Sequence, residues 1–118
     1  MILLATVILI LIGVLHSYLG EKYILIRLFK RDNIPHLLGG DHFTKGTLRF
    51  CWHIMSVAAF GFAAILYNNA EDIFVLTTIG LVFLVSALLS IFYTKGKHLS
   101  WVAFLIVSMI CFWQVYSA

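Results

Sequence analysis

Four long apolar segments constrain the fold of this chain more than any other feature. They cover about residues 1–19, 48–67, 73–93 and 99–116. A helix of about 20 residues crosses the ~30 Å hydrocarbon core of a bilayer. Helices satisfy their own backbone hydrogen bonds in lipid, whereas open strands do not. We therefore predict an all-α fold, a four-helix antiparallel transmembrane bundle that forms one integral membrane domain over residues 1–118.

The composition agrees with a chain whose outer surface faces lipid. Hydrophobic residues make up 63% of the chain and charged residues 11%, whereas a soluble domain carries about 25% charged residues. So much apolar surface excludes a disordered chain. The first segment has no basic stretch before it and no A-x-A-like cleavage site after it, so we expect a retained helix rather than a signal peptide.

The basic residues predict the orientation of the chain. Six of the eight Lys and Arg lie in residues 20–49 and two in the 94–98 turn, whereas the 68–72 turn carries only acidic charge. The positive-inside rule then places the first and third connections in the cytoplasm and both termini outside. The net charge of +3 is accounted for by topology and by attraction to anionic lipid. We expect the lipid bilayer as a partner and no nucleic acid.

The long first connection lies between the first two predicted helices. Its first part, EKYILIRLFKRD, is predicted to continue the first helix past the membrane surface or to lie in the interface. Pro35 and the Gly39–Gly40 pair then interrupt it, and Asp41 or Thr44 is a candidate N-cap for the next helix. The two later connections are short turns, which predict that successive helices are antiparallel neighbours.

Small residues indicate where helices approach one another. Gly13 and Gly20 flank a histidine on the first helix, and Ser86 and Ser90 lie four residues apart on the third. Such residues allow membrane helices to pack closely. We expect packing within the chain, with a homodimer surface as the alternative.

The five histidines all fall on the predicted cytoplasmic side. His16 ends the first apolar segment, His53 follows the start of the second, and His98 precedes the fourth, while His36 and His42 lie in the first connection. Polar groups inside a membrane usually pair with one another or mark a site.

Imidazoles from different helices of a bundle are common ligands of metals and haem. We therefore name His16, His53 and Glu21 as candidate cofactor-binding residues. The same three residues with His98 are candidate metal ligands, and a transition metal or haem is a possible cofactor.

Three interpretations of this group remain open. The two helix histidines could be hydrogen-bonded packing residues beside an ion pair of Glu21 with Arg49. They could hold a metal or haem, although no H-x-x-x-H or E-x-x-H spacing occurs. His16 and Glu21 could instead do acid–base work on a small molecule. No nucleophile motif, phosphate loop or dinucleotide fingerprint is present, so enzymatic activity is left open.

Two stretches carry a family resemblance, HSYLGEK and RFCWHIMSVAAFGFAA. The chain resembles a group of small bacterial four-helix inner-membrane proteins with H-S-x-L-G-E ending the first helix and W-H opening the second. The matching residues are His16, Ser17, Leu19, Gly20, Glu21, Trp52 and His53. The resemblance implies a bacterial inner-membrane location and points to these residues as a site. It implies no particular reaction.

The sequence therefore predicts a small polytopic membrane protein with a histidine and glutamate cluster at its cytoplasmic end. We expect this cluster to bind a metal, haem or a small polar ligand. The alternative is a non-catalytic accessory or assembly subunit in which the cluster is structural.

Overall fold

The computed structural model describes all residues, 1–118, and it is helical apart from its connections. One helix starts as α1, passes through a π-helical turn, η1, and ends as α2, so that it runs without a break for 27 residues. The elements in chain order are α1 (Ile2–Gly20), η1 (Glu21–Leu25), α2 (Ile26–Leu28), α3 (His42–Asn68), α4 (Ile73–Thr94) and α5 (Ser100–Ser117).

The prediction of four membrane-spanning helices agrees with the structure. Four helices are long and apolar enough to cross a bilayer. The predicted spans are close to the bounds of α4 and α5, and the first two helices extend beyond their spans, to Leu28 and from His42. The prediction that EKYILIRLFKRD continues the first helix is confirmed as far as Leu28, and the predicted start of a helix after Asp41 is confirmed. Charged residues in the EKYILIRLFKRD and DHFTKGT stretches are good enough helix formers to continue a helix beyond the hydrocarbon. Hydropathy marks only the part of a helix that lies in lipid.

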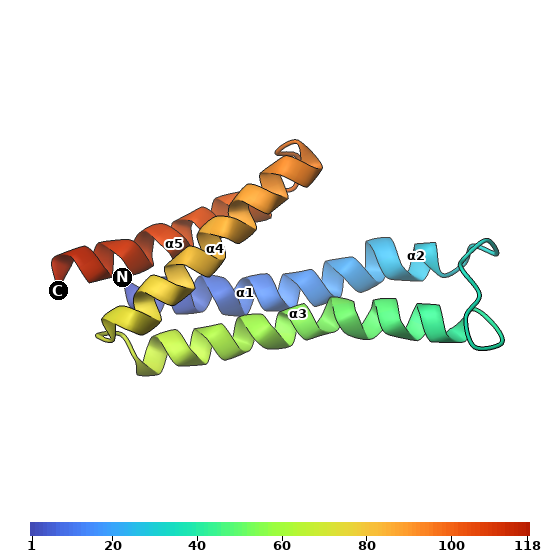
Figure 1. Ribbon diagram of the computed structural model, residues 1–118, viewed down its shortest axis with the longest axis horizontal. Coiled ribbons are helices and arrows are strands. Elements are labelled where there is room, and N and C mark those ends of the chain that lie inside the picture. Colours follow the sequence, from blue (N-terminus) through green and yellow to red (C-terminus); the bar gives the residue numbers. More distant parts are fainter.

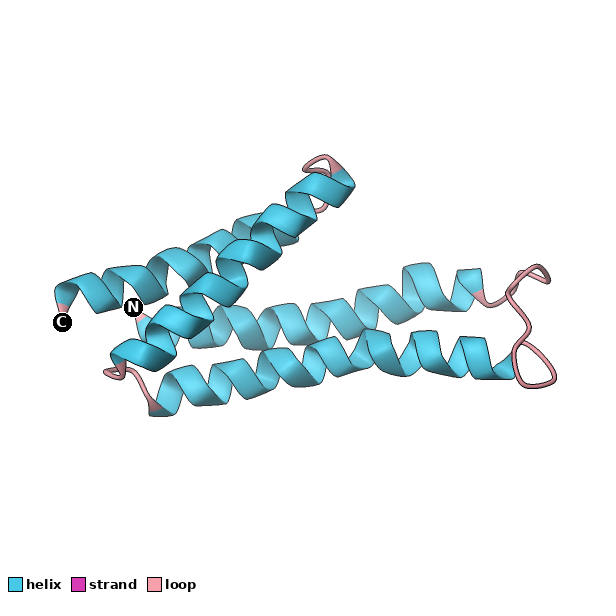
Figure 2. Ribbon diagram, in the orientation of Figure 1, coloured by secondary structure: helices cyan, strands magenta, loops and turns pink.

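The helices form two hairpin-like pairs (Figure 1). α1 packs along α3, and α4 packs along α5, while the two pairs meet mainly through α1 and α5. Figure 2 shows the long loop that joins the first pair at one end of the molecule. The prediction that helices joined by short turns are close neighbours was wrong for α3 and α4, which diverge from the 69–72 turn and make little contact. The main partner of α3 is α1, across the long connection.

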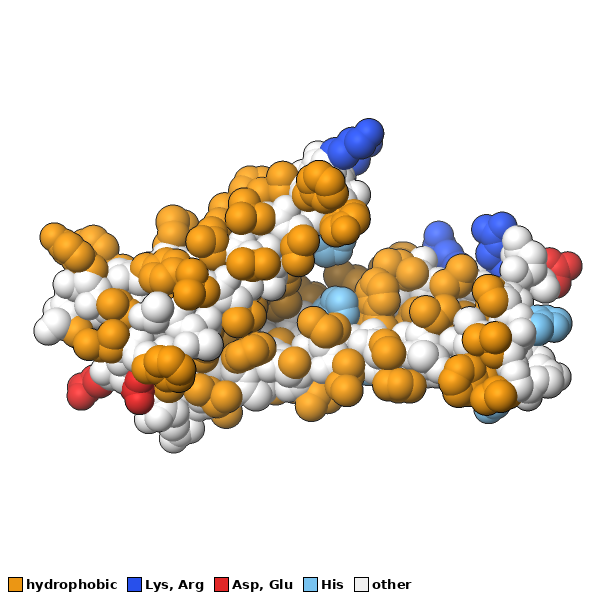
Figure 3. Space-filling view, viewed as in Figure 1, with side chains coloured by type: hydrophobic (Ala, Val, Ile, Leu, Met, Phe, Trp, Pro, Cys, Tyr) orange, Lys and Arg blue, Asp and Glu red, His pale blue; other side chains and the backbone are white.

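The buried core lies where the two pairs meet, near the chain termini. Only 20 of the 118 residues are buried, so most apolar side chains face outward, as Figure 3 shows. This distribution suits helices that lipid surrounds, because lipid covers apolar side chains as well as a protein core does. The core cluster consists of Ile2, Ala5, Leu9, Ala63, Leu66, Leu76, Ile79, Phe83, Val107, Ile110 and Cys111.

The ends of the helices carry local hydrogen bonds. The Asp72 side chain accepts from the Val75 backbone N–H at 3.0 Å and so caps α4. Asp41 precedes α3 as predicted, but its carboxylate pairs with Lys45 at 2.6 Å rather than capping the backbone. The hydrogen bond from Lys45 lowers the pKa of the Asp41 carboxyl below its ordinary value.

Two glycines let α1 and α3 approach closely. A Cβ atom on Gly20 would overlap the indole of Trp52, and one on Gly13 would overlap the ring of Phe60. Each glycine therefore receives an aromatic ring of α3. This is packing within the chain, as predicted, and these two glycines lend no support to a homodimer.

Gly20→Ala is expected to destabilise the protein, because the added methyl group displaces the Trp52 ring. Overpacking of this kind lowers the free energy of unfolding by about 1–3 kcal/mol. Thermal unfolding of the detergent-purified variant measures the effect. The matched control is Gly61→Ala in α3, where a Cβ atom meets nothing within 4 Å. Equal melting temperatures for the two variants would contradict the close packing at Gly20.

Candidate functional site

An ion pair joins the two helices of the first hairpin. Arg49 on α3 donates two hydrogen bonds to Glu21, from Nη2 to Oε1 at 2.7 Å and from Nε to Oε2 at 3.2 Å. The prediction that Glu21 pairs with Arg49 is confirmed. The guanidinium also lies over the ring of Phe29, 4.9 Å from its centroid. The two-point geometry fixes the carboxylate more firmly than a single contact does.

His53 extends this ion pair into a longer polar chain. Its Nε2 lies 3.0 Å from Glu21 Oε2 and its Nδ1 lies 2.8 Å from Ser17 Oγ. Ser17 Oγ in turn lies 2.6 Å from Ser56 Oγ, a buried hydroxyl of α3. The chain therefore runs Arg49, Glu21, His53, Ser17, Ser56, and it crosses between the two helices at every step.

The partners of His53 define where its proton lies. An ionised carboxylate only accepts hydrogen bonds, so Nε2 carries the proton that is donated to Glu21. In the neutral ring Nδ1 then accepts from the Ser17 hydroxyl, and Ser17 accepts from Ser56. A carboxylate that orients an imidazole, which in turn accepts from a serine, is an arrangement also found at nucleophilic sites. Here Ser17 also accepts a hydrogen bond from Ser56, so its hydroxyl group is bonded on both sides.

The sequence builds this chain from two pairs of residues four apart. Ser17 and Glu21 share one face of the first helix, and Arg49 and His53 share one face of α3. Because the two helices run antiparallel, these pairs interleave. A π-helical turn begins at Glu21, where the Ile26 backbone N–H donates to the Glu21 carbonyl, five residues back. Turns of this type often occur at functional sites.

His16 has a different partner from His53. Its ring is stacked on Trp52, with centroids 4.7 Å apart and an interplanar angle of 7°. His16 Nε2 donates to the Trp52 carbonyl at 3.1 Å, and Trp52 Nε1 donates to the His16 carbonyl at 2.9 Å. With Nε2 protonated, the neutral ring keeps a lone pair on Nδ1, which has no hydrogen-bond partner within the protein.

His98 lies in the turn between α4 and α5, on the other hairpin. Its Nδ1 accepts from the Ser100 backbone N–H at 3.3 Å and lies 2.8 Å from Ser100 Oγ. Ser100 Oγ also lies 2.8 Å from Ser90 Oγ. Because Nδ1 accepts, Nε2 of the neutral ring carries the proton and is a free donor.

An opening separates the two hairpins on the side of the basic connections. Figure 3 shows this opening, with histidine side chains on both of its walls. His98 is the one histidine in the α4–α5 hairpin.

The predicted site residues are only partly brought together. Glu21 and His53 are in direct contact, whereas His16 binds Trp52 and His98 belongs to the other hairpin. No three His, Cys, Asp or Glu side chains are grouped so that they could hold a metal ion. The geometry therefore gives no support to metal ligation by His16, His53, His98 and Glu21 as one set.

Ser56 was not recognised from the sequence. Ser17 and Trp52 belong to the motif that carries the resemblance, but their roles, as a link of the polar chain and as the partner of His16, were not predicted. Gly20 was a signal for Trp52, because a glycine on one helix leaves room for a large side chain of the neighbouring helix. No sequence signal identifies Ser56, since serines that bond only within their own helix, such as Ser86, look the same.

No protein-family model, no curated protein sequence and no solved structure matches this chain.

Removing the Ser17–Ser56 contact is expected to weaken the packing of α1 on α3. The coupling free energy from a double-mutant cycle of Ser17→Ala and Ser56→Ala should be about 0.6 kcal/mol, the average for hydrogen bonds between membrane helices, and at most about 1.7 kcal/mol. Unfolding in detergent micelles measures it. Ser86→Ala is the control, because its hydroxyl bonds only the Val82 carbonyl of its own helix. A coupling of zero would contradict the contact.

Proposed function

We propose that this chain is a multi-pass protein of the bacterial inner membrane that binds a small polar ligand between its two hairpins. His16 and His98 make the contacts in this proposal. Glu21 and His53 join α3 to the helix that carries His16. The observation that supports the proposal is that His16 and His98 each have one ring nitrogen without a protein partner, while histidine side chains flank the opening between the hairpins.

The two free nitrogens differ in character, which narrows the class of ligand. His16 Nδ1 accepts a hydrogen bond and His98 Nε2 donates one. A small molecule with both a donor and an acceptor, such as a hydroxyl or a carboxylic acid, matches this pair. Structural and catalytic metal sites usually use three or four protein ligands, and no third group joins these two. We therefore favour a polar organic ligand over a metal. Haem, which imidazoles bind as axial ligands, is the alternative.

Protein purified in mild detergent is expected to carry a stoichiometric compound that solvent extraction releases and mass spectrometry detects. His16→Ala and His98→Ala should each remove it, because each takes away one of two hydrogen bonds. His36→Ala and His42→Ala, exposed histidines of the first connection, should retain it. A visible spectrum and metal analysis of the same samples report haem or metal. Identical extracts from wild type and all four variants would contradict the proposal.

The proposed orientation has both termini outside and the first connection in the cytoplasm. The charge distribution supports it, with basic residues in 20–49 and 94–98 and only acidic ones in 68–72. Alkaline phosphatase, which folds actively only outside the cytoplasm, should be active when fused after Ala118 and inactive when fused after Gly40. The reverse pattern would contradict this orientation.

A second candidate function is that of a non-catalytic accessory or assembly subunit, which could act as a homodimer or with another protein. The observation that favours it is the saturation of the polar chain, since no buried side-chain nitrogen or oxygen lacks a hydrogen-bond partner. A saturated network stabilises a unique packing of helices and leaves little for a ligand to satisfy. This function predicts that His16→Ala lowers stability and removes no bound compound.

A further inference from the structure

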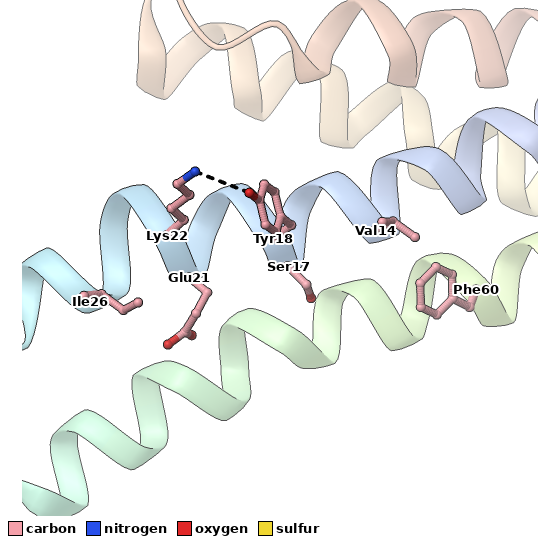
Figure 4. A pocket seen from close by; sticks show the side chains of 8 residues that line it. Val14, Ser17, Tyr18, Glu21, Lys22, Ile26 and Phe60 are labelled. Atoms are coloured by element: carbon pink, nitrogen blue, oxygen red, sulfur yellow. Dashed lines mark hydrogen bonds between the residues drawn. The ribbon is translucent and has the colours of Figure 1, made fainter.

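A groove runs along the first helix on the side where that helix meets α3. It has a volume of about 590 Å³ and lies open to the surroundings of the helices. Gly13, Val14 and Phe60 line its deep end, and Lys22 and Ile26 line its shallow end (Figure 4). Neither His16 nor His98 lines it.

The part of the groove between Gly13 and Lys22 matches one leaflet of a bilayer in length. Gly13 and Lys22 are nine residues apart, which corresponds to about 13–14 Å along a helix. Half of a ~30 Å hydrocarbon core is about 15 Å. If Lys22 lies at the headgroup level, where basic side chains of helix ends reside, the end at Gly13 lies near the middle of the membrane.

The polar atoms along the middle of the groove are already bonded within the protein. Ser17 is engaged by His53 and Ser56, and Glu21 is engaged by Arg49 and His53. Figure 4 shows Ser17 and Glu21 pointing toward α3. An occupant of this stretch therefore meets mainly apolar surface, and the part of it that lies here is itself apolar.

The mouth of the groove presents a cation without an acidic partner. Lys22 Nζ donates to Tyr18 Oη at 3.3 Å and lies 5.5 Å and 5.4 Å from the ring centroids of Tyr18 and Tyr23. No carboxylate pairs with Lys22, because Glu21 is taken by Arg49 and His53. The ammonium group is thus held in place by aromatic side chains while it keeps free donors.

We propose that this groove binds one anionic diacyl phospholipid, with its phosphate on Lys22 and one acyl chain lying along Val14 to Phe60. An apolar slot of leaflet depth fits the chain, and a held cation at the membrane surface fits the phosphate. Basic pockets between transmembrane helices are known to bind lipid headgroups. We choose a phospholipid as the ligand because it combines an anionic headgroup for the cation with an acyl chain for the apolar slot.

The test is a titration of the delipidated protein in detergent with palmitoyl-oleoyl phosphatidylglycerol, followed by native mass spectrometry. One equivalent is expected to bind more tightly than phosphatidylcholine with the same chains. Lys22→Gln should weaken binding of the anionic lipid about fivefold, the effect of one lysine near a charged headgroup. Lys30→Gln, an exposed cation outside the groove, is the matched control and should change binding little.

A second pair of variants tests the acyl-chain slot. Val14→Trp fills the groove and should abolish the tight equivalent, whereas Leu15→Trp, on an exposed neighbouring position outside the groove, should leave it. The chain-free headgroup glycerophosphoglycerol should not compete. Equal effects of Lys22→Gln and Lys30→Gln, full binding by Val14→Trp, or competition by the free headgroup would each overturn the proposal.

Discussion

The structure depends on one constraint: a polar side chain at membrane depth needs a partner, because lipid offers none. Ser17, Glu21 and His53 meet this need by bonding to one another across two helices, with Arg49 and Ser56 at the ends of the chain. The contact aligns α1 with α3 along the length where both carry polar residues. The long loop between them only has to return the chain to the start of α3.

The polar chain and the apolar core occupy different ends of the molecule. Core residues of all four long helices meet near the termini, while the polar chain belongs to the first hairpin alone. The second hairpin is therefore held at one end and diverges at the other. This division leaves an opening between the hairpins with histidine side chains on both walls, and it leaves a groove along the first helix open to its surroundings. The two proposed binding sites follow from the same arrangement.

The sequence pattern predicted the features that a lipid environment requires, but little of the packing between the helices. The four spans follow from segment length, and the Glu21–Arg49 pair follows from the cost of leaving charges alone near a membrane. The pairing of α1 with α3 could not be predicted from connection lengths, because it depends on glycines that receive aromatic rings and on interleaved polar residues. Helix ends beyond the predicted spans were found from local signals, since EKYILIRLFKRD continues the first helix as far as Leu28 and Asp41 precedes α3.

The candidate site was predicted in composition but not in geometry. His53 and Glu21 were expected to converge, and they do. His16 was grouped with them because it lies at a similar depth. Its ring instead stacks on Trp52, because residues 16 and 17 point in directions about 100° apart on a helix. The position of a residue along a helix follows from the sequence. Which face of the helix contributes to a site depends on how the partner helix packs against it.

The most direct test of this account is ¹⁵N NMR of the histidine rings in the protein reconstituted into lipid bilayers. At alkaline pH, where the imidazole is neutral, His53 should be protonated at Nε2 and bare at Nδ1. Glu21→Gln and Ser17→Ala should each shift its signals, and Ser86→Ala should leave them unchanged. A His53 ring with its proton on Nδ1, or one whose signals ignore both Glu21→Gln and Ser17→Ala, would contradict the polar chain that joins the first hairpin.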